Sequence, residues 1–595
     1  MPSRYPTPRS AALLLALVVT SAFAAESRYE VLNLRTVGFS DAYAVNNHGH
    51  VVGGAPNGAR FVWNGTSVAQ IQMPEYHSVV TGLNDEGTII GFRPFPFSND
   101  RGFVIANGTF AEFEPTRIPT ALNNSGQIAM SIGNPSRPVI YHAGALTEIG
   151  SLGRSTILSA INTAGWVVGS APITEDVDPK RAVLFRNGAL NVLGTLGGNH
   201  SWASDINDAG NILGGARDEA GNSHVTLYTA GKMLPIGSYD PQGEHVTLKI
   251  NNYNLAIGHF ATGAHLWSGG VLKPLAELVD LAGRGFDIVE LVDFNDRGQI
   301  LLRGWNRALD TQSDPLLLTP RPGLSARLTA LAARAAAGAN DQTSIAGFVL
   351  AGNSSGSVLL RTVGPGLLPL GVSNAASDPT LRIFNSANTI VATNDNWSAD
   401  SAEAATLAPT AARLGAQPLA AGSNDAALLA DLPPGAYTAH ASNSTDSSRI
   451  VLTEIYDAGD ENDARLSAAS IRLQIGTGES IGIVGFALAG EGPAKVLLRA
   501  LGPDLASRGV TGALADPQLW LYRGSTPVMG NDDWGSAATT PLLASTTTQV
   551  GLPALADASK DAALLIQLEP GAYSLHVSGA NNSTGVALVE VYLVP

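Results

Sequence analysis

The stretch INDAGNILGG (residues 206–215) is one of seven near-copies of a single pattern. In each copy an apolar residue precedes an asparagine, two variable residues follow, and a glycine or its substitute leads into an apolar strand. The seven asparagines are Asn46, Asn84, Asn123, Asn162, Asn207, Asn251 and Asn295. Spacings of roughly 40 residues are typical of repeat architectures, so the first half of the chain is a repeat array.

The residue types in this pattern predict a tight turn between two strands. An asparagine side chain can hydrogen-bond to the backbone two residues on, and glycine adopts the left-handed conformation that ends such a turn. The sixth copy has Asn254 in place of glycine, and asparagine is the non-glycine residue that best tolerates that conformation. We therefore expect Asn254→Gly to be neutral or mildly stabilising in the native turn, offset by a few tenths of a kcal/mol from chain entropy.

A second hairpin lies between these turns. Each example is a hydrophobic strand that ends in an Asn-Gly or other glycine-containing turn, and another short strand follows it. The six examples are VWNG (62–65), VIANG (104–108), IYHAG (140–144), LFRNG (184–188), LYTAG (227–231) and LWSGG (266–270). Each period therefore holds four strands, which is the composition of one propeller blade.

The number of hairpins indicates how the array closes. The first hairpin occurs seven times and the second only six times, because the chain leaves the array after DPLLLTP (314–320). The segment YEVLNL (29–34) precedes the first copy with nothing to pair with, so we expect it to complete the last blade. The sequence predicts a seven-bladed β-propeller over residues 25–320. Six or eight blades and an open β-solenoid are the alternatives.

The rest of the chain contains one β-rich module twice. Segments such as VLLRTVGPGL (358–367) and PPGAYTAHAS (433–442) return in the same order as VLLRALGPDL (496–505) and EPGAYSLHVS (569–578). Strands that alternate with Gly and Pro turns over about 130 residues predict a β-sandwich. We expect two tandem, jelly-roll-like β-sandwich modules over 321–457 and 458–595, with a helical turn at 399–407. Exposed linkers should lie near 318–327 and 457–466.

Both halves resemble known families. The repeat units, with LGTLGG at 193–198, are similar to the HAF-type extracellular repeats of secreted bacterial proteins. The third and seventh copies depart from that pattern, with Met130 and Leu302 where the others have glycine. The duplicated module resembles a C-terminal module of secreted bacterial proteins and, more distantly, the prepeptidase C-terminal sandwich. These resemblances imply an extracellular location and a repeat scaffold, but no reaction.

Composition and the N-terminus agree with secretion of an all-β protein. Only 14% of the 595 residues are charged, and there are 65 glycines and 34 prolines, which is typical of many short strands. Residues 1–24 have a basic start, a short apolar core and an AFA cleavage site, so we predict a signal peptide that is cut after Ala24.

The chain has no cysteine, and it contains 35 basic and 50 acidic residues. This acidity argues against nucleic acid and anionic membranes as partners, and no later segment predicts membrane insertion.

Several motifs suggest chemistry but have simpler explanations. GNSSG (352–356) matches a nucleophile elbow at Ser354 but is followed by a strand, as is the dinucleotide-like GTGESIG (476–482). His48 and His50 lack a third metal ligand. The loops at Asn394–Asp395 and Asp532–Asp533 have oxygen ligands that suit calcium, or they are turns with Trp397 and Trp534 beneath. We expect Glu454 and Glu590 to pair with Arg361 and Arg499. No residue is assigned as catalytic, cofactor-binding or metal-binding, and no cofactor is expected.

The sequence is consistent with two functions. The first is a secreted, non-enzymatic binding or surface-interaction protein, with an extracellular polysaccharide or a surface protein as its partner. The second is an extracellular hydrolase or lyase that acts on polysaccharide. Such an enzyme would need convergent carboxylates or a His/Tyr set on several blades. These would appear as blade-specific departures from the repeat, and Glu86, Trp166, Tyr253 and Arg297 are such departures.

Overall fold

A computed structural model describes residues 27–595, apart from 74–77, 95–99, 115–116, 134–136, 151–155, 175–176, 240–246, 310–312, 339–342, 444–448, 461 and 536–539. The predicted signal peptide lies outside the described residues. Internal contacts divide the chain into a first unit, Ala24–Gly323, and a second unit made of Leu324–Ser536 and Thr540–Pro595.

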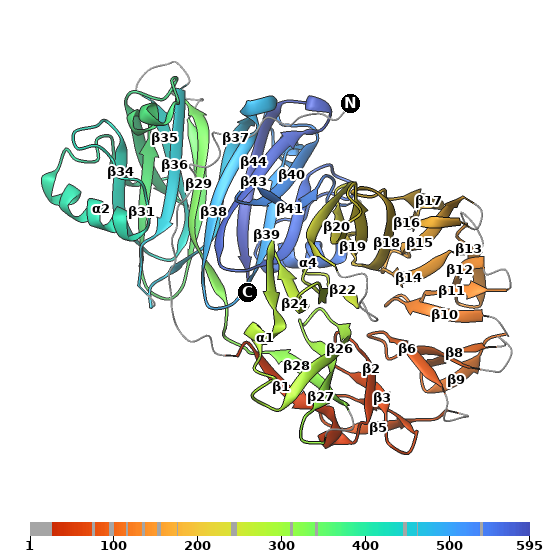
Figure 1. Cartoon of the computed structure of the whole chain (residues 1–595). Coiled ribbons are helices and arrows are strands. Elements are labelled where there is room, and N and C mark those ends of the chain that lie inside the picture. Colours follow the sequence, from red (N-terminus) through yellow and green to blue (C-terminus); the bar gives the residue numbers. More distant parts are fainter. Residues whose placement is uncertain are drawn as a thin grey trace. The chain divides into compact units, whose positions relative to one another are not determined.

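The first unit is a seven-bladed β-propeller (Figure 1). Each blade is a four-stranded antiparallel sheet, and the innermost strands of neighbouring blades contact one another around the whole ring. Blades 1 to 3 comprise β2 (Asp41–Val45), β3 (Val51–Gly54), β4 (Arg60–Trp63) and β5 (Val68–Ile71); β6 (Val79–Leu83), β7 (Ile89–Arg93), β8 (Arg101–Ala106) and β9 (Thr109–Glu112); and β10 (Arg117–Leu122), β11 (Ile128–Ile132), β12 (Arg137–His142) and β13 (Ala145–Glu148). Blades 4 to 6 comprise β14 (Ile157–Ile161), β15 (Val167–Thr174), β16 (Val177–Arg186) and β17 (Ala189–Val192); β18 (Gly197–Ile206), β19 (Ile212–Asp218), β20 (Ser223–Thr229) and β21 (Lys232–Ser238); and β22 (Leu248–Ile250), β23 (Ala256–Phe260), β24 (Gly263–Ser268) and β25 (Val271–Pro274), followed by α1 (Leu275–Leu278).

The seventh blade closes the ring with a strand from the other end of the unit. Its strands are β26 (Phe286–Phe294), β27 (Ile300–Asn306), β28 (Ser313–Pro320) and β1 (Tyr29–Asn33), and β1 pairs antiparallel with β28. The short 3-10 helix η1 (Leu34–Val37) then leads into the first blade. The prediction of seven blades closed by the segment 29–34 is confirmed, and the open solenoid is excluded.

The repeated turns have the predicted backbone. The glycine of each turn has φ between +73° and +80°, and Asn254 has φ +58° in the same position. In the second hairpins, Asn107 and Asn187 adopt positive φ in the same way. These conformations agree with the turn chemistry that the sequence predicts.

The second unit contains two eight-stranded antiparallel sheets, and separate sandwich modules are not seen. The duplicated copies each supply four strands to each sheet. The first sheet has the order β34 (Ala426–Leu432), β31 (Gly356–Val363), β36 (Arg449–Asp457), β29 (Ala326–Ala337), β38 (Gly482–Gly490), β43 (Gly571–Gly579), β40 (Pro517–Arg523) and β41 (Thr526–Asn531). The second sheet has the order β33 (Ile390–Asn394), β32 (Pro379–Asn385), β35 (Gly435–Asn443), β30 (Ser344–Ala351), β37 (Arg465–Ile475), β44 (Gly585–Val594), β39 (Ala494–Leu501) and β42 (Ala562–Leu568).

The copies are joined within the sheets. The first strand of each copy pairs with the second strand of the other, as β29 with β38 and β37 with β30. This exchange pairs strands that would otherwise be exposed sheet edges. Among the described residues of this unit, six short helices lie between the strands: η4 (Pro365–Leu370), α2 (Ser401–Arg413), η5 (Gly478–Ser480), α3 (Pro503–Ser507), α4 (Thr540–Gln549) and η6 (Ala580–Asn582). The predicted helical turn at 399–407 overlaps the start of α2. Within the described part of the chain, no helix is long and apolar enough to span a bilayer.

Candidate functional site: the axis of the propeller

The innermost strands leave one edge without a neighbour in their own sheet. These strands are β2, β6, β10, β14, β18, β22 and β26, and they surround the axis of the ring (Figure 1). Their free N–H and C=O groups need partners, because unpaired backbone groups away from bulk water are costly. The side chains that supply these partners define the chemistry of the axis.

The seven repeat asparagines form a closed ring of hydrogen bonds. The Nδ2 of each donates to the main-chain oxygen of the equivalent asparagine in the next blade, at 2.7–3.2 Å, and Asn295 donates back to Asn46. Each Oδ1 accepts locally, for example from the N–H groups of His48 and His50 in the case of Asn46. All seven side chains are buried. The sequence analysis predicted the hydrogen bonds within each turn, but it did not predict the hydrogen bonds between neighbouring blades.

The residue after each asparagine forms a second ring, the axial ring. Its members are Asn47, Asp85, Asn124, Thr163, Asp208, Asn252 and Asp296. At six of the seven positions the main-chain N–H donates to the Oδ1 of the next member, at 2.7–2.9 Å. The exception is Asn124, whose neighbour Thr163 has neither a carboxylate nor an amide oxygen. The axial ring therefore gathers oxygen acceptors where the turns meet.

Three members of the axial ring are carboxylates, and asparagine amides separate them. The Nδ2 of Asn252 donates to both Asp208 and Asp296 at 3.0 Å, and Asn47 and Asn124 donate to Asp85. Burial raises the pKa of Asp296, and the charges of Asp208 and Asp85 add to that rise, against the hydrogen bonds from Asn252. The side-chain amides of Asn47, Asn124 and Asn252 thus stabilise three carboxylates around the axis of the ring.

A third group lies two residues before the asparagine on three consecutive inner strands. This inner triad is Asp205, Lys249 and Asp293, at positions where blades 1 to 4 have alanine or glycine. Asp205 accepts from the N–H of Ile250, and Asp293 accepts from the N–H of Val45, each at 2.9 Å in the next blade. The carboxylates therefore satisfy free edge amides of the neighbouring inner strands.

Lys249 lies between the two carboxylates of the inner triad. Its Nζ is 3.8 Å from Asp293 Oδ1, and its side chain is 38% exposed although it stands on an inner strand. Burial lowers the pKa of Lys249, but Asp205 and Asp293 outweigh that effect and the net shift is upward. Burial is also the main cause of the raised pKa of Asp205, against the attraction of Lys249.

Three of the departures noted in the sequence, and the two histidines, have the following surroundings. Trp166 is buried in the core between two blades, with the guanidinium of Arg186 5.3 Å from its ring. Arg297 Nη1 donates to the main-chain oxygen of His48, while Glu86 is exposed. The rings of His48 and His50 are 5.7 Å apart. Burial, and then the charges of His48 and Arg297, lower the pKa of His50.

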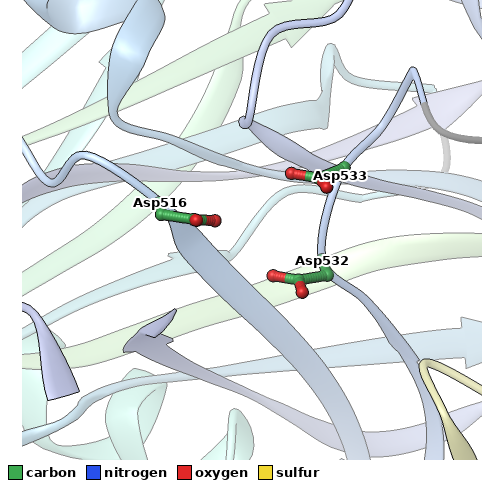
Figure 2. Close-up of side chains that lie close together, drawn as sticks. All are labelled: Asp516, Asp532 and Asp533. Carbon is green, nitrogen blue, oxygen red and sulfur yellow. The ribbon is translucent and has the colours of Figure 1, made fainter. Parts of the chain in front are cut away.

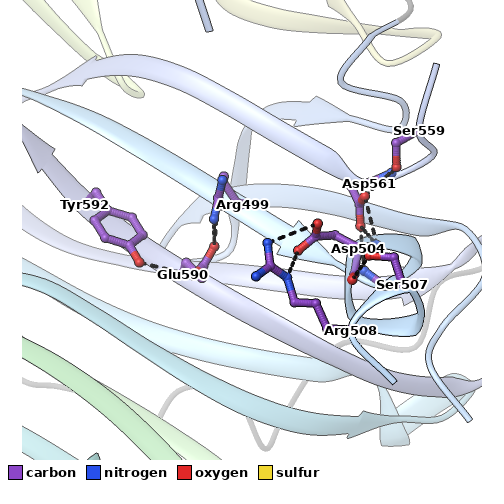
Figure 3. Close-up of polar contacts among 9 residues, drawn as sticks. Arg499, Asp504, Ser507, Arg508, Ser559, Asp561, Glu590 and Tyr592 are labelled. Carbon is purple, nitrogen blue, oxygen red and sulfur yellow. Dashed lines mark hydrogen bonds and ion pairs between the residues drawn. The ribbon is translucent and has the colours of Figure 1, made fainter. Parts of the chain in front are cut away.

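In the second unit the predicted ion pairs are present. Arg499 Nη2 is 2.6 Å from Glu590 Oε2, and Tyr592 donates to the same carboxylate (Figure 3). Arg361 and Glu454 make the equivalent pair in the first copy, at 3.2 Å. These four side chains are at most 7% exposed, so the pairs belong to the core and act structurally. Nearby, Asp561 accepts main-chain N–H groups of the Gly502 loop (Figure 3).

The loop at Asp532–Asp533 gains a third carboxylate that the sequence analysis missed. Carboxylate oxygens of Asp516, Asp532 and Asp533 lie within 4.8 Å of one another (Figure 2). Burial is the main cause of the raised pKa of Asp532, and the charges of Asp533 and Asp516 contribute. This donor set could hold a small cation, but Lys560 already pairs with Asp516.

The tryptophans after these loops are placed as the turn interpretation predicts. Trp397 and Trp534 are buried, and each Nε1 donates at 3.1 Å to a main-chain oxygen. Asn394 Oδ1 accepts from the N–H of Ala427, which fixes the first-copy loop. Ser354 lies in the connection between β30 and β31, which belong to different sheets, and donates to Asn462 O. The segment 476–482 leads into strand β38, as expected.

No family model and no curated protein sequence matches the chain. Among solved structures, the β-propeller domain of the Trilobed protease from Pyrococcus furiosus has 11% identity and a TM-score of 0.35, covering 47% of this chain and 95% of that one. TolB from Acinetobacter baumannii has 12% identity and a TM-score of 0.26, covering 48% of this chain and 64% of that one. An acylaminoacyl peptidase from Pyrococcus horikoshii has 12% identity and a TM-score of 0.30, with 43% and 48% covered. This chain thus spans less than two thirds of the last two proteins, and its function must be argued from its own residues.

Proposed function

We propose that the protein is a secreted, non-enzymatic binding or surface-interaction protein whose propeller axis binds neutral polysaccharide. The observation that carries the proposal is the axial ring, a ring of carboxylate and amide oxygens where the seven turns meet. Secretion rests on the signal peptide predicted at 1–24. The second unit, in which the two C-terminal copies share both sheets, then acts as one accessory β-structure.

Sugar hydroxyls complement the chemistry of the axial ring. Ionised carboxylates are acceptors only, and hydrogen bonds to them are stronger than those between neutral groups. Asp85, Asp208 and Asp296 are held by hydrogen bonds to the turns of neighbouring blades. This preorganisation favours binding, because the side chains lose little conformational entropy when a ligand binds. The same carboxylates disfavour sulfated or uronic acid polymers, because like charges repel at short range.

The alternative is a polysaccharide hydrolase or lyase. The observation in its favour is the inner triad, since glycoside hydrolysis uses two carboxylates and the pKa of Asp205 is raised, chiefly by burial. Both carboxylates, however, are engaged by main-chain N–H groups of the next blade. Hydrolysis also requires that one of these carboxyl groups transfers a proton, whereas binding needs only hydrogen-bond acceptors, so binding is the better supported function.

A glycan array and an activity screen on the same polymers separate these functions. We expect neutral glycans to bind and no new reducing ends or unsaturated products to form. Asp208→Asn and Asp296→Asn should weaken that binding while thermal unfolding stays cooperative. Glu219→Gln, an exposed acid between β19 and β20, should leave binding unchanged. Product formation would support the enzyme, and binding restricted to anionic glycans would contradict the proposed ligand class.

A further inference from the structure

A cavity of about 90 Å³ lies between helix α2 and the first large sheet in the first copy of the duplicated module. Its floor is formed by Leu359 and Arg361 of β31 and Ala427 of β34, and Trp397 and Leu407 are among its walls. Its mouth is bordered by exposed residues of the helix and the loop that follows, namely Ala408, Ala412, Gln417 and Pro418.

Small side chains on the helix and its following loop leave this space empty. Ala411, Ala412 and Ala416 all line the cavity. The second copy aligns with the first through Leu407 and Leu543, so its residues at these three positions are Thr547, Thr548 and Leu552. The duplicate therefore carries a larger side chain at each position.

The only charged side chain of the lining is Arg361. It is 2% exposed, and its Nε and Nη1 make no hydrogen bond. Arg499 Nη1 in the second copy has no hydrogen-bond partner either. Arg499 Nε, however, donates to Glu590 Oε2 at 2.7 Å. The copies thus differ in the hydrogen bonding of Nε and in the size of the side chains beside the arginine, while Nη1 lacks a partner in both.

The charge of Arg361 is already balanced. Glu454 Oε2 is 3.2 Å from its Nε, and Glu454 Oε1 accepts a hydrogen bond from Tyr456. A second anion beside this pair would leave a net buried negative charge, which is costly. A neutral oxygen acceptor would satisfy a guanidinium N–H without that cost.

We propose that this cavity, the α2 cavity, binds a small uncharged molecule with an apolar ring or short chain and one carbonyl oxygen. The apolar part contacts Leu359, Leu407 and Trp397, and the carbonyl oxygen accepts from Arg361 Nη1. This site is independent of the polysaccharide proposed for the propeller. Its ligand is recognised by shape and by one hydrogen bond, as is usual for small-molecule pockets.

The test uses the full-length protein and saturation-transfer NMR with three probes: cyclohexanone, cyclohexanecarboxylate and cyclohexylammonium. We expect saturable binding of cyclohexanone and at least about tenfold weaker binding of both charged probes. Binding of cyclohexanecarboxylate equal to or tighter than that of the ketone would overturn the argument from charge balance. Absence of saturable ketone binding would overturn the site itself.

Variants taken from the duplicate locate the binding. Ala416→Leu fills the cavity with the residue that the second copy has, and it should abolish the ketone signal. Ala405→Leu, the same change at an exposed position of α2 outside the lining, should not alter the signal. Ala411→Thr provides a smaller second-copy substitution and should weaken binding even if Ala416→Leu proves unstable. Binding that both cavity variants leave unchanged would refute the proposal.

Discussion

Gly210 and Asn254 occupy the same position of the repeated turn, and each has a second role there. A Cβ on Gly210 would lie 2.6 Å from the Trp166 ring, and its φ is +76°. The Oδ1 of Asn254 accepts hydrogen bonds from both Asn207 and Asn211, at 2.7 and 2.8 Å. Asparagine is therefore favoured at position 254 by its hydrogen bonds with Asn207 and Asn211 as well as by the turn conformation.

These contacts change the effect expected for Asn254→Gly. The substitution removes an acceptor from two buried amides, so we expect a loss of about 1–2 kcal/mol rather than a neutral result. Gly210→Val should cost more, about 3 kcal/mol or above, because backbone strain and a steric clash add together. Denaturant unfolding measures both free energies. Wild-type stability for Asn254→Gly would restore the simpler account of the turn.

His576 in the second unit should make stability depend on pH. Its ring stacks on Tyr522 at 4.1 Å between centroids, and burial lowers the pKa of His576 from 6.5 to about 4. Because the folded state binds the proton less readily, this contribution is fully present above pH 6.5 and is lost as the pH falls toward 4. It amounts to about 3 kcal/mol at most.

The measurement compares unfolding free energies at pH 7.5 and 4.5 for the wild type and His576→Gln. We expect the variant to lose less stability between the two pH values, by up to about 3 kcal/mol. Equal losses in the two proteins would show that this histidine is protonated as easily in the folded state as in the unfolded chain.

At the scale of the element, the ring of asparagines should stabilise the contact between adjacent inner strands. Asn46→Asp keeps the Oδ1 that accepts from His48 and His50 but removes the amide donated to Asn84. A buried carboxylate oxygen would then face a carbonyl oxygen, at a cost of about 3 kcal/mol.

The matched control is Asn64→Asp in an exposed hairpin turn of the same blade. Asn64 Oδ1 accepts from the N–H groups of Thr66 and Ser67, which a carboxylate can also do. We expect this variant to stay within about 0.5 kcal/mol of the wild type in thermal or denaturant unfolding. Similar losses at the two positions would mean that the bond between blades adds no stability.

The turns could be predicted from the sequence because their chemistry is local. Asn46 and Gly49 determine their own turn, and the same residue types return in every blade. The bond from Asn46 to Asn84 could not be predicted, because a single asparagine explains the turn without it. The sequence contained a weaker indication of the inner triad, because its three charged residues stand at a repeat position where blades 1 to 4 have alanine or glycine. The sequence contained no indication that Asp516 joins Asp532 and Asp533, because Asp516 approaches Asp532 only through the pairing of β40 with β41.

At the scale of the whole molecule, the duplication predicted the strands of the second unit but not their partners. Strands β29 and β38 carry buried apolar residues that suit a neighbour from either copy. Which neighbour is used depends on the three-dimensional arrangement of the copies, and here the pairing crosses between them. The predicted linker at 318–327 is shorter in the structure, because its two ends belong to β28 and β29. We therefore expect cleavage at 321–325 to release one C-terminal fragment, with the copies remaining associated.

Closure of the ring makes the stability of the propeller depend on its N-terminal strand. Tyr29 and Leu34 are buried, the first in the core between the sixth and last blades and the second in the core that joins the last blade to the first. Asn33 Nδ2 donates to Asp314 at 2.9 Å, so the strand is also held by a side-chain contact across the closure.

Deletion of residues 29–36 should therefore affect the whole propeller. The deletion exposes the edge of β28 and part of two apolar cores, so we expect lost cooperativity or aggregation of the first unit. The second unit should still unfold as a separate transition, because among the described strands β1 pairs only within the seventh blade. Glu30→Ala, which changes an exposed residue of the same strand, should leave calorimetric unfolding near that of the wild type. In an array whose units contact only their neighbours, the deletion would fray one end and spare the rest. A cooperative first-unit transition with an almost unchanged midpoint would show that closure by β1 is dispensable for stability.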